Sequence, residues 1–253
     1  MATRVSKRKQ PRREEKPLKE RTKIAGKVLD DSTVSVIVKL LNNGFIKSVD
    51  YPISHGKEAV VFRCTAGKKL PNEEFVALKA YKYETSSFRN LMKYIEGDPR
   101  FSHVKKKLRP LVKEWARKEF ANLKKSFERG VKVPNPFKQK ENVLIMEFLG
   151  EGGLPSAKLQ DVRLENPKKT FEEVVENMKK MYQARLVHAD LSSYNIVIHK
   201  GEAYLIDVSQ AVLLDHPLAK EFLERDVENI AKYFKKEGVE KAETEGITQE
   251  ITR

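Results

Sequence analysis

The chain of 253 residues is poor in several features that define common protein classes. Its single cysteine, Cys64, excludes an internal disulfide and a multi-cysteine zinc site, and its V-V-F-R-C setting favours a small buried hydrophobe. No apolar run reaches the roughly 18 residues of a membrane span. The N-terminus is basic and polar and has no apolar signal segment. We therefore expect an intracellular protein that makes no membrane contact.

Acidic residues are scarce in two parts of the chain. Residues 1–27 hold eleven Lys and Arg against three Glu, which gives +8 of a total net charge of +14. Residues 100–132 hold twelve against three, an excess of +9. A flexible basic tail and a second basic face predict a polyanionic partner, for which nucleic acid is the natural candidate. A merely solubilising tail and the wet side of a helix are the alternatives.

Composition nevertheless indicates a well-packed protein, because 40% of residues are hydrophobic and 34% are charged. This length suits one bilobal enzyme or two small domains. The most informative stretch is 186–210, where His188, Asp190 and Asn195 follow the kinase pattern H-x-D-x-x-x-x-N. Asp207 ends a second apolar run. An ordinary β-hairpin around Lys200 and Gly201 explains the same apolar runs, so the elements upstream must decide.

Phosphoryl transfer gives each of these polar groups a role. Asp190 would accept or orient the proton of the attacking hydroxyl, while Asn195 and Asp207 would hold Mg²⁺, which prefers oxygen ligands. Upstream, F-V-A-L-K-A predicts a strand that ends in Lys79 and matches the V-A-I-K pattern of a phosphate-binding lysine.

Glycine is scarce where a nucleotide enzyme would have it. The polar turn in P-I-S-H-G-K-E-A contains only Gly56 and does not match G-x-G-x-x-G. A helix is expected near 108–129, and its Glu119 is preferred over Glu114 as the partner of Lys79 because Glu119 lies beside the apolar stripe. The region 81–102 is expected to be partly a mobile loop. Its candidate phosphorylation sites are Ser86, Ser87 and Ser102.

The remaining elements follow from local signals. A short helix is predicted over 33–42, and a second should open at the capping box formed by Thr170 and Glu173. The run V-L-I-M-E-F-L-G predicts a buried strand leading into a hinge between lobes. Three of its residues would meet adenine, Met146 through its side chain and Glu147 and Leu149 through their backbones.

Together these motifs resemble one family, the RIO atypical protein kinases, over roughly residues 50–234. The motifs that carry the resemblance are P-I-S-H-G-K-E-A, V-A-L-K, K-E-F-A-N-L, L-I-M-E-F, L-V-H-A-D-L-S-S-Y-N and L-I-D-V-S-Q followed by D-H-P. The resemblance implies an α+β, bilobal kinase-like fold with a β-rich N-lobe, one main N-lobe helix and a reduced helical C-lobe. The short helical N-terminus is similar to the subfamily without an N-terminal winged helix, as in archaea. Only 46 residues follow Asp207, with no A-P-E element, so an activation loop and peptide-binding helices should be absent.

The resemblance also implies the site and its ligands. Asp190 would be the catalytic acid/base, Asn195 and Asp207 the metal ligands, and Asp207 a candidate phospho-acceptor. Lys79 would hold phosphates and Glu119 would orient it. The phosphate loop would comprise Ser54, Gly56, Lys57 and Glu58. Two positions depart from the family pattern: His55 stands where Thr is usual, and Ser193 where an acid is common.

ATP and Mg²⁺, or Mn²⁺ in its place, are the implied cofactors, and the pre-ribosomal small subunit with its rRNA is the implied partner. The expected setting is a microbial cytoplasm. The expected organisation is a basic tail (1–27), a helical segment (28–49), an N-lobe (50–146), a hinge with the C-lobe (147–240) and a polar tail (241–253). Two other functions stay open: a small-molecule phosphotransferase of the aminoglycoside or choline type, and a nucleotide-gated RNA-binding assembly factor without catalysis.

Overall fold

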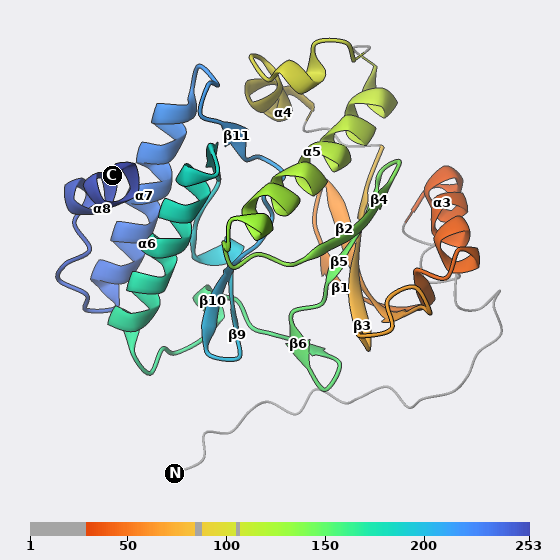
Figure 1. The fold of residues 1–253 in the computed structure, drawn as a ribbon, viewed down its shortest axis with the longest axis horizontal. Helices are drawn as coiled ribbons and strands as arrows, with labels where there is room; N and C mark the ends of the chain where they lie inside the picture. Colours follow the sequence, from red (N-terminus) through yellow and green to blue (C-terminus); the bar gives the residue numbers. More distant parts are fainter. Residues whose placement is uncertain (1–28, 84–87, 105–106) are drawn as a thin grey trace.

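A lobe built on a sheet and a lobe built on helices divide the chain (Figure 1). The computed structural model describes residues 29–83, 88–104 and 107–253. The expected basic tail 1–27 and the candidate phosphorylation sites Ser86 and Ser87 lie outside the described residues. The α+β bilobal architecture expected from the sequence is present.

The N-lobe is a five-stranded antiparallel sheet with the strand order β1-β2-β3-β5-β4. Alternate residues of β2, Val60, Phe62 and Cys64, are fully buried, as a strand with one face on a core requires. Cys64 is thus the buried hydrophobe that its sequence context indicates. The strands are β1 (Ile46–His55), β2 (Ala59–Ala66), β3 (Phe75–Tyr81), β4 (Pro136–Lys140) and β5 (Val143–Glu147).

Two helices pack on this sheet. Helix α3 (Asp31–Asn42) starts two residues before the expected Thr33, because Asp30 caps it by accepting hydrogen bonds from the Ser32 and Thr33 N–H groups. Helix α5 (Leu108–Glu128) crosses between the sheet and the other lobe (Figure 1). Trp115 and other apolar residues of its buried face belong to the larger of two hydrophobic cores.

The region expected to be partly loop contains α4 (Phe88–Ile95) and the 3₁₀ turn η1 (Pro99–Phe101). Leu91, Tyr94 and Phe101 are buried in the core that α5 shares, which supplies the packing that orders this stretch. Ser102 follows η1 directly and is exposed. Local sequence gave little sign of α4, because its order comes from tertiary contacts.

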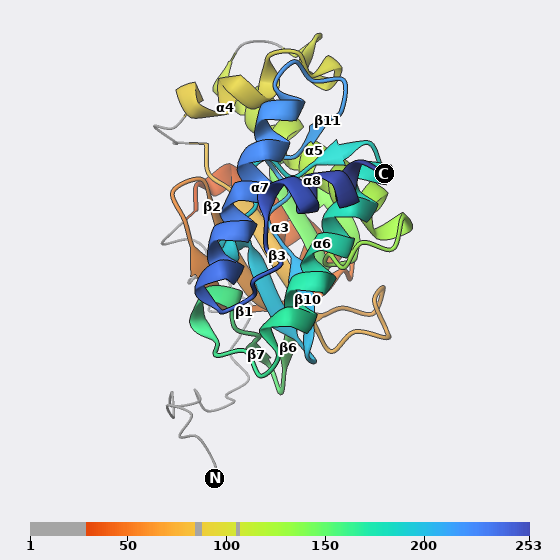
Figure 2. The same cartoon turned by 90° about the vertical axis from the view of Figure 1, so that its left-hand side faces the viewer.

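The C-lobe is helical, with short antiparallel strand pairs facing the N-lobe. Its first helix begins a turn before the expected capping box, because Asn166 accepts a hydrogen bond from Lys169 N–H and Pro167 takes the first helical position. Its three helices lie together at one end of the molecule, on the left in Figure 1, and this end faces the viewer in Figure 2. They are α6 (Pro167–Gln183), α7 (Ala219–Lys236) and α8 (Thr244–Thr252). The minor elements are β6 (Gly150–Glu151), β7 (Leu154–Pro155), η2 (Leu159–Asp161), β8 (Leu186–Val187), η3 (Ser193–Asn195), β9 (Ile196–His199), β10 (Glu202–Leu205) and β11 (Val212–Leu213).

The expectation of a polar tail over 241–253 is wrong, because α8 packs against α6 and α7. Ile247 and Ile251 lie one turn apart and are 2% and 0% exposed. Two isoleucines among polar neighbours give a weak sequence signal, although their spacing of four is that of a helix face. Within the described part of the chain, none of the helices has the length and apolar character needed to cross a membrane.

Candidate active site

Lys79 lies where the two lobes meet and forms two ion pairs. Its Nζ is 2.7 Å from Glu119 Oε1 on α5 and 2.8 Å from Asp207 Oδ1 in the C-lobe. Residues 40 and 128 positions away in the sequence are thereby joined to one ammonium group. The expected pair of Lys79 and Glu119 is present, whereas Glu114 pairs with Arg117 on the surface of α5.

Burial and charge act in opposite directions at this cluster. Burial alone would lower the pKa of Lys79, but the Asp207 and Glu119 carboxylates raise it well above its ordinary value. Burial likewise opposes the charge of Asp207, yet Lys79 and a hydrogen bond from Ser209 hold its pKa at about 2. Lys79 is therefore a cation and Asp207 an anion at neutral pH. The side chain of Glu119 is 1% exposed, whereas that of Asp207 is 47% exposed.

Tyr81 also belongs to this cluster, and sequence reasoning missed it. Its hydroxyl donates a hydrogen bond to Glu119 Oε2. Tyr81 lies two residues after Lys79 on β3, so both side chains leave the same face of the strand. That alternation was the signal that could have identified Tyr81.

The catalytic-loop residues Asp190 and Asn195 lie side by side between β8 and β9. Asn195 Nδ2 donates to the Asp190 backbone oxygen at 2.8 Å and to its carboxylate at 3.3 Å. Burial, followed by the nearby charge of Asp207, raises the pKa of Asp190, while Arg225, Asn195 and Lys93 oppose the shift. A raised pKa makes the Asp190 carboxylate a stronger base than a solvated aspartate.

A buried carboxylate on α7, which sequence reasoning missed, holds the catalytic loop. Asp226 accepts hydrogen bonds from Ala189 N at 2.7 Å and from Leu191 N at 2.8 Å, the two neighbours of Asp190. Asn229 adds a bond of 3.0 Å to the Leu191 oxygen. The available signal was the position of Asp226 within the apolar stripe of α7. An acid is rarely buried without partners, so this position predicts hydrogen-bond donors around it.

Backbone geometry is unusual at Asp207 and at Ala189, the residue before Asp190. Asp207 and Ala189 have φ of 59° and 66°, in the left-handed region that non-glycine residues rarely occupy. His188 Nε2, assigned as the donor, lies 3.1 Å from the Ile206 oxygen and thus ties the two segments together. Strained backbone of this kind persists where surrounding contacts fix it, and it is common at functional sites.

Asn195 and Asp207 offer oxygen ligands that fit Mg²⁺. Because the amide nitrogen of Asn195 is engaged by Asp190, its Oδ1 is left as the acceptor. Mg²⁺ usually takes only one or two protein ligands and completes its shell with water and phosphate oxygens. Within residues 29–83, 88–104 and 107–253, no group of three or more His, Cys, Asp or Glu that could hold a metal ion is found.

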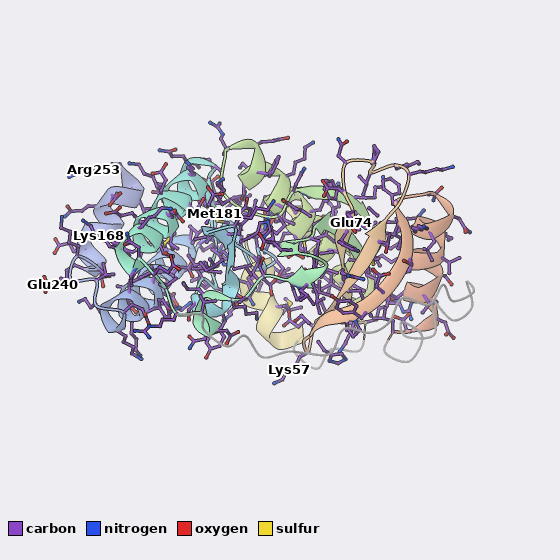
Figure 3. The ribbon with its side chains drawn as sticks, turned by 90° about the horizontal axis from the view of Figure 1, so that it is seen from below. Lys57, Glu74, Lys168, Met181, Glu240 and Arg253 are labelled. Atoms are coloured by element: carbon purple, nitrogen blue, oxygen red, sulfur yellow. The ribbon has the colours of Figure 1, made fainter. Side chains whose placement is uncertain are left out.

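The candidate phosphate loop closes the β1–β2 hairpin. Ser54 is an exposed residue near the end of β1. The Gly56 N–H donates to the Ala59 oxygen at 2.9 Å, and Lys82 Nζ donates to the Gly56 oxygen at 2.9 Å. Lys57 points outward at the rim of the molecule (Figure 3). Glu58 directly precedes β2 and is half-buried.

Gly56 is not required by the fold itself. Its φ lies outside the left-handed region, and a Cβ there would come no closer than 3.4 Å to another atom, the Ala59 oxygen. By contrast, a Cβ on Gly67 would lie 2.3 Å from the Gly44 oxygen. The fold therefore explains glycine at 67 but not at 56.

The hinge follows β5. Met146 lies opposite Ala77 of β3 and is half-buried. Glu147 N–H donates to the Asn135 oxygen at 2.8 Å, and the Leu149 oxygen accepts from Ser156 N–H at 3.0 Å. Adenine would therefore meet the other backbone group of each residue, the Glu147 oxygen and the Leu149 N–H.

The basic face expected over 100–132 is smaller than the count of charges indicates. Lys118 is buried, and Lys105 and Lys106 lie outside the described residues. Six further cations form ion pairs: Arg100 with Asp98, Arg109 with Asp30, Lys113 with Glu141, Arg117 with Glu114, Lys124 with Glu128 and Lys132 with Glu202. Four of these acids come from outside the segment, so a count along the chain could not include them.

A smaller basic group lies near the end of α5, with Asp215 beside it. Partial burial and the nearby charges of Arg100, Arg185 and Arg129 lower the pKa of Lys125. Arg185 also pairs with Asp215 at 2.6 Å. We call Lys125, Arg129 and Arg185 the α5-end cluster.

The lysine–glutamate pair, the catalytic loop and the two lobes define a protein-kinase-like phosphotransferase. Comparison with solved structures supports this fold: the Rio2 kinase–ADP/Mg²⁺–phosphoaspartate complex from Chaetomium thermophilum superposes with a TM-score of 0.60 at 21% identity, over 80% of this chain and 60% of that one.

Sequence comparison gives the family. The RIO domain family matches residues 60–247. RIO-type serine/threonine-protein kinase Rio1 of Haloferax volcanii is 43% identical over 218 residues, which cover 86% of this chain and 74% of that protein. The Rio1 kinase of Methanocaldococcus jannaschii is 38% identical over 227 residues, covering 89% and 76%. The chain belongs to the RIO family, as its motifs indicated, and is a serine/threonine protein kinase.

Proposed function

We propose that the protein transfers the γ-phosphoryl group of ATP, with Asp190 as the general base and with Mg²⁺ held at Asn195 and Asp207. The observation that carries the proposal is the joining of Lys79, Glu119 and Asp207 by bonds of 2.7 and 2.8 Å at the junction of the lobes. Lys79 would neutralise phosphate charge. Asp190, with its raised pKa, would take the proton of the acceptor hydroxyl.

Bound Mg²⁺, or Mn²⁺ in its place, would supply neutralisation of the phosphate oxygens. The protein's own part is orientation. Asn195 and Asp207 would fix the position of the ion, and Asp226 fixes the loop that carries Asp190. Gly56 would allow backbone N–H groups to approach the phosphates, which accounts for a glycine that the fold does not require.

The decisive experiment incubates the full chain with γ-labelled ATP and Mg²⁺ and follows protein-bound label and free phosphate separately. Asp190→Ala should lower the label on serine and threonine hydroxyl groups at least about a hundredfold, the scale of losing a general base. Asp161→Ala, an exposed aspartate in η2, is the matched control and should behave as wild type. Equal transfer by wild type and Asp190→Ala would refute the assignment.

We further propose that Asp207 is itself a phosphoryl acceptor, so that hydrolysis of its phosphate makes the protein an ATPase switch. The Rio2 structure compared above contains ADP, Mg²⁺ and phosphoaspartate. In our protein the Asp207 carboxylate is ionised and 47% exposed, as a nucleophile must be. Protein-bound label should be partly released by hydroxylamine, which cleaves acyl phosphates but leaves phosphoserine intact. Complete resistance would exclude the acyl phosphate.

We propose the maturing small ribosomal subunit in the cytoplasm as the setting, with rRNA as the partner of the α5-end cluster. Lys125, Arg129 and Arg185 bring cations together from two elements that are distant in sequence. Lys125→Glu with Arg129→Glu should weaken RNA binding and flatten the slope of log K against log salt by about 2. Lys220→Glu, 90% exposed on α7, is the control. An unchanged salt slope would place the RNA contact elsewhere.

A further inference from the structure

A lysine on the inner face of α5 is completely buried, although the chemistry described above does not use it. Lys118 is 0% exposed, and lysine is almost never fully buried unless it is paired. Its Nζ lies 3.4 Å from two backbone oxygens, those of Tyr94 and Gln210, and 4.5 Å from the centre of the Trp115 ring. The lysine thus bridges the end of α4 and the segment after Asp207.

Asn122, one turn further along α5, bridges the segment after Asp207 and η1. Its Nδ2 donates to the Val208 and Ala211 oxygens at 2.9 and 3.1 Å. Its Oδ1 accepts from Arg100 Nη1 at 2.8 Å. Asn122 is 1% exposed. Lys118 and Asn122 together hold three carbonyl groups of the four residues that follow Asp207.

The backbone that they hold is the one that needs support. Asp207 has φ of 59°, and a left-handed non-glycine residue persists only where neighbouring contacts fix it. Ser209 fixes the Asp207 side chain, and Lys118 and Asn122 fix the main chain beyond it. Glu119, next to Lys118, reaches Asp207 from the other side through Lys79.

We propose that Lys118 and Asn122 are positioning residues that hold Asp207 in its metal-binding conformation and tie it to residues 94–100. The inference rests on the proposed metal role of Asp207. It assigns to α5 a second function beside its ion pair with Lys79. It also makes the α4 region a structural partner of the metal site.

Stability alone does not account for Lys118. Burial, followed by repulsion from Arg100, lowers the pKa of Lys118 to about 7, so its ammonium form is costly in this position; Asp98 and Glu119 act in the opposite direction. Asp98 is engaged by Arg100 at 2.6 Å. A charge that is buried without a paired counter-charge is costly, and an apolar group of similar volume removes that cost. Lys118→Met should therefore leave the fold as stable as wild type or more so.

The test measures binding of ADP to the full chain by calorimetry over a range of Mg²⁺ concentrations, together with the melting temperature. Lys118→Met should weaken apparent Mg²⁺ affinity about tenfold, as expected for losing hydrogen bonds from a charged group. Its ADP affinity without Mg²⁺ should stay within about twofold of wild type, and its melting temperature should not fall. Lys124→Met, on the exposed face of the same helix, should match wild type in all three.

Asn122→Ala should weaken Mg²⁺ affinity in the same direction. Its melting temperature should fall, because buried carbonyl groups lose their donor and, unlike in Lys118→Met, no costly buried cation is removed to offset that loss. Wild-type Mg²⁺ affinity in both variants would overturn the proposal. It would also be overturned if Lys118→Met lost Mg²⁺ affinity, Mg²⁺-free ADP affinity and stability to the same extent, because that result would indicate general damage to the fold. Asp207→Ala separates the two hypotheses. If it binds Mg²⁺·ADP like wild type, the metal site itself is wrong.

Discussion

Asp226→Asn tests whether the catalytic loop is held from α7. The two carboxylate oxygens of Asp226 each accept one backbone N–H, at 2.7 and 2.8 Å, in a site that is 1% exposed. An asparagine amide presents one oxygen and one NH₂ group, so in either orientation one of the two N–H groups faces a donor. We expect a loss of about 2–4 kcal/mol from the missing bond and the unsatisfied N–H.

Such a loss lowers the melting temperature by about 5–15 °C in a chain of this size, since each kcal/mol corresponds to about 2–4 °C. Phosphoryl transfer should fall about a hundredfold, the effect of misplacing a catalytic group by about 1 Å. Thermal unfolding and label transfer from ATP measure the two effects. Glu224→Gln, on the exposed side of α7, is the control. Wild-type stability and activity in Asp226→Asn would refute the role of Asp226.

The pH dependence of the same variant provides a second check. Burial outweighs the two N–H donors and raises the pKa of Asp226 to about 7, from an unfolded value near 3.8. The folded state therefore binds this proton more tightly than the unfolded state, and the contribution of Asp226 to stability falls as pH rises from about 4 through 7. Asparagine has no such dependence, so the stability gap between wild type and variant should be larger at pH 5 than at pH 8. A gap that widens with pH would show that Asp226 is ionised.

Three further substitutions probe the nucleotide and catalytic residues. Gly56→Ala should leave the melting temperature unchanged, because the fold has room for a Cβ there. It should raise KM for ATP, because the Cβ would keep bound phosphate from approaching the backbone. An unchanged KM would remove Gly56 from the phosphate loop. Lys79→Met should cost about 3–5 kcal/mol in unfolding measurements, since Glu119 is left buried without its cation, and adding Glu119→Gln should recover part of that loss. Asp190→Asn should abolish transfer yet raise the melting temperature, because burial and Asp207 raise the Asp190 pKa and so disfavour its charged form in the folded protein.

Parts of the site were predictable because they depend on spacing within one segment. Asp190 and Asn195 are five residues apart, and the loop that joins them brings their side chains into contact at 3.3 Å. Lys79 was placed by its strand pattern. The choice of Glu119 over Glu114 followed from helical periodicity, because only Glu119 lies on the buried face of α5.

Other parts could not be predicted because their partners are distant in sequence. Asp226 contacts Leu191, 35 residues away, and nothing local to α7 indicates that pairing. The charges of residues 100–132 were misjudged for the same reason. Lys113 pairs with Glu141 and Lys132 with Glu202, so charge that is unbalanced along the chain is balanced in space.

Helix α5 shows how one element can assemble a site from both lobes. Lys118, Glu119 and Asn122 are buried on its inner face and contact, respectively, the Gln210 oxygen, Lys79 and the Val208 oxygen. The three side chains belong to one helix and therefore move together. A rotation of α5 that releases Glu119 from Lys79 would also release the backbone after Asp207. The ion pair and the metal ligand are therefore set by the same helix orientation. A change in that orientation would disrupt the proposed phosphate contact of Lys79 and the proposed metal contact of Asp207 together, so α5 links the two lobes of this kinase.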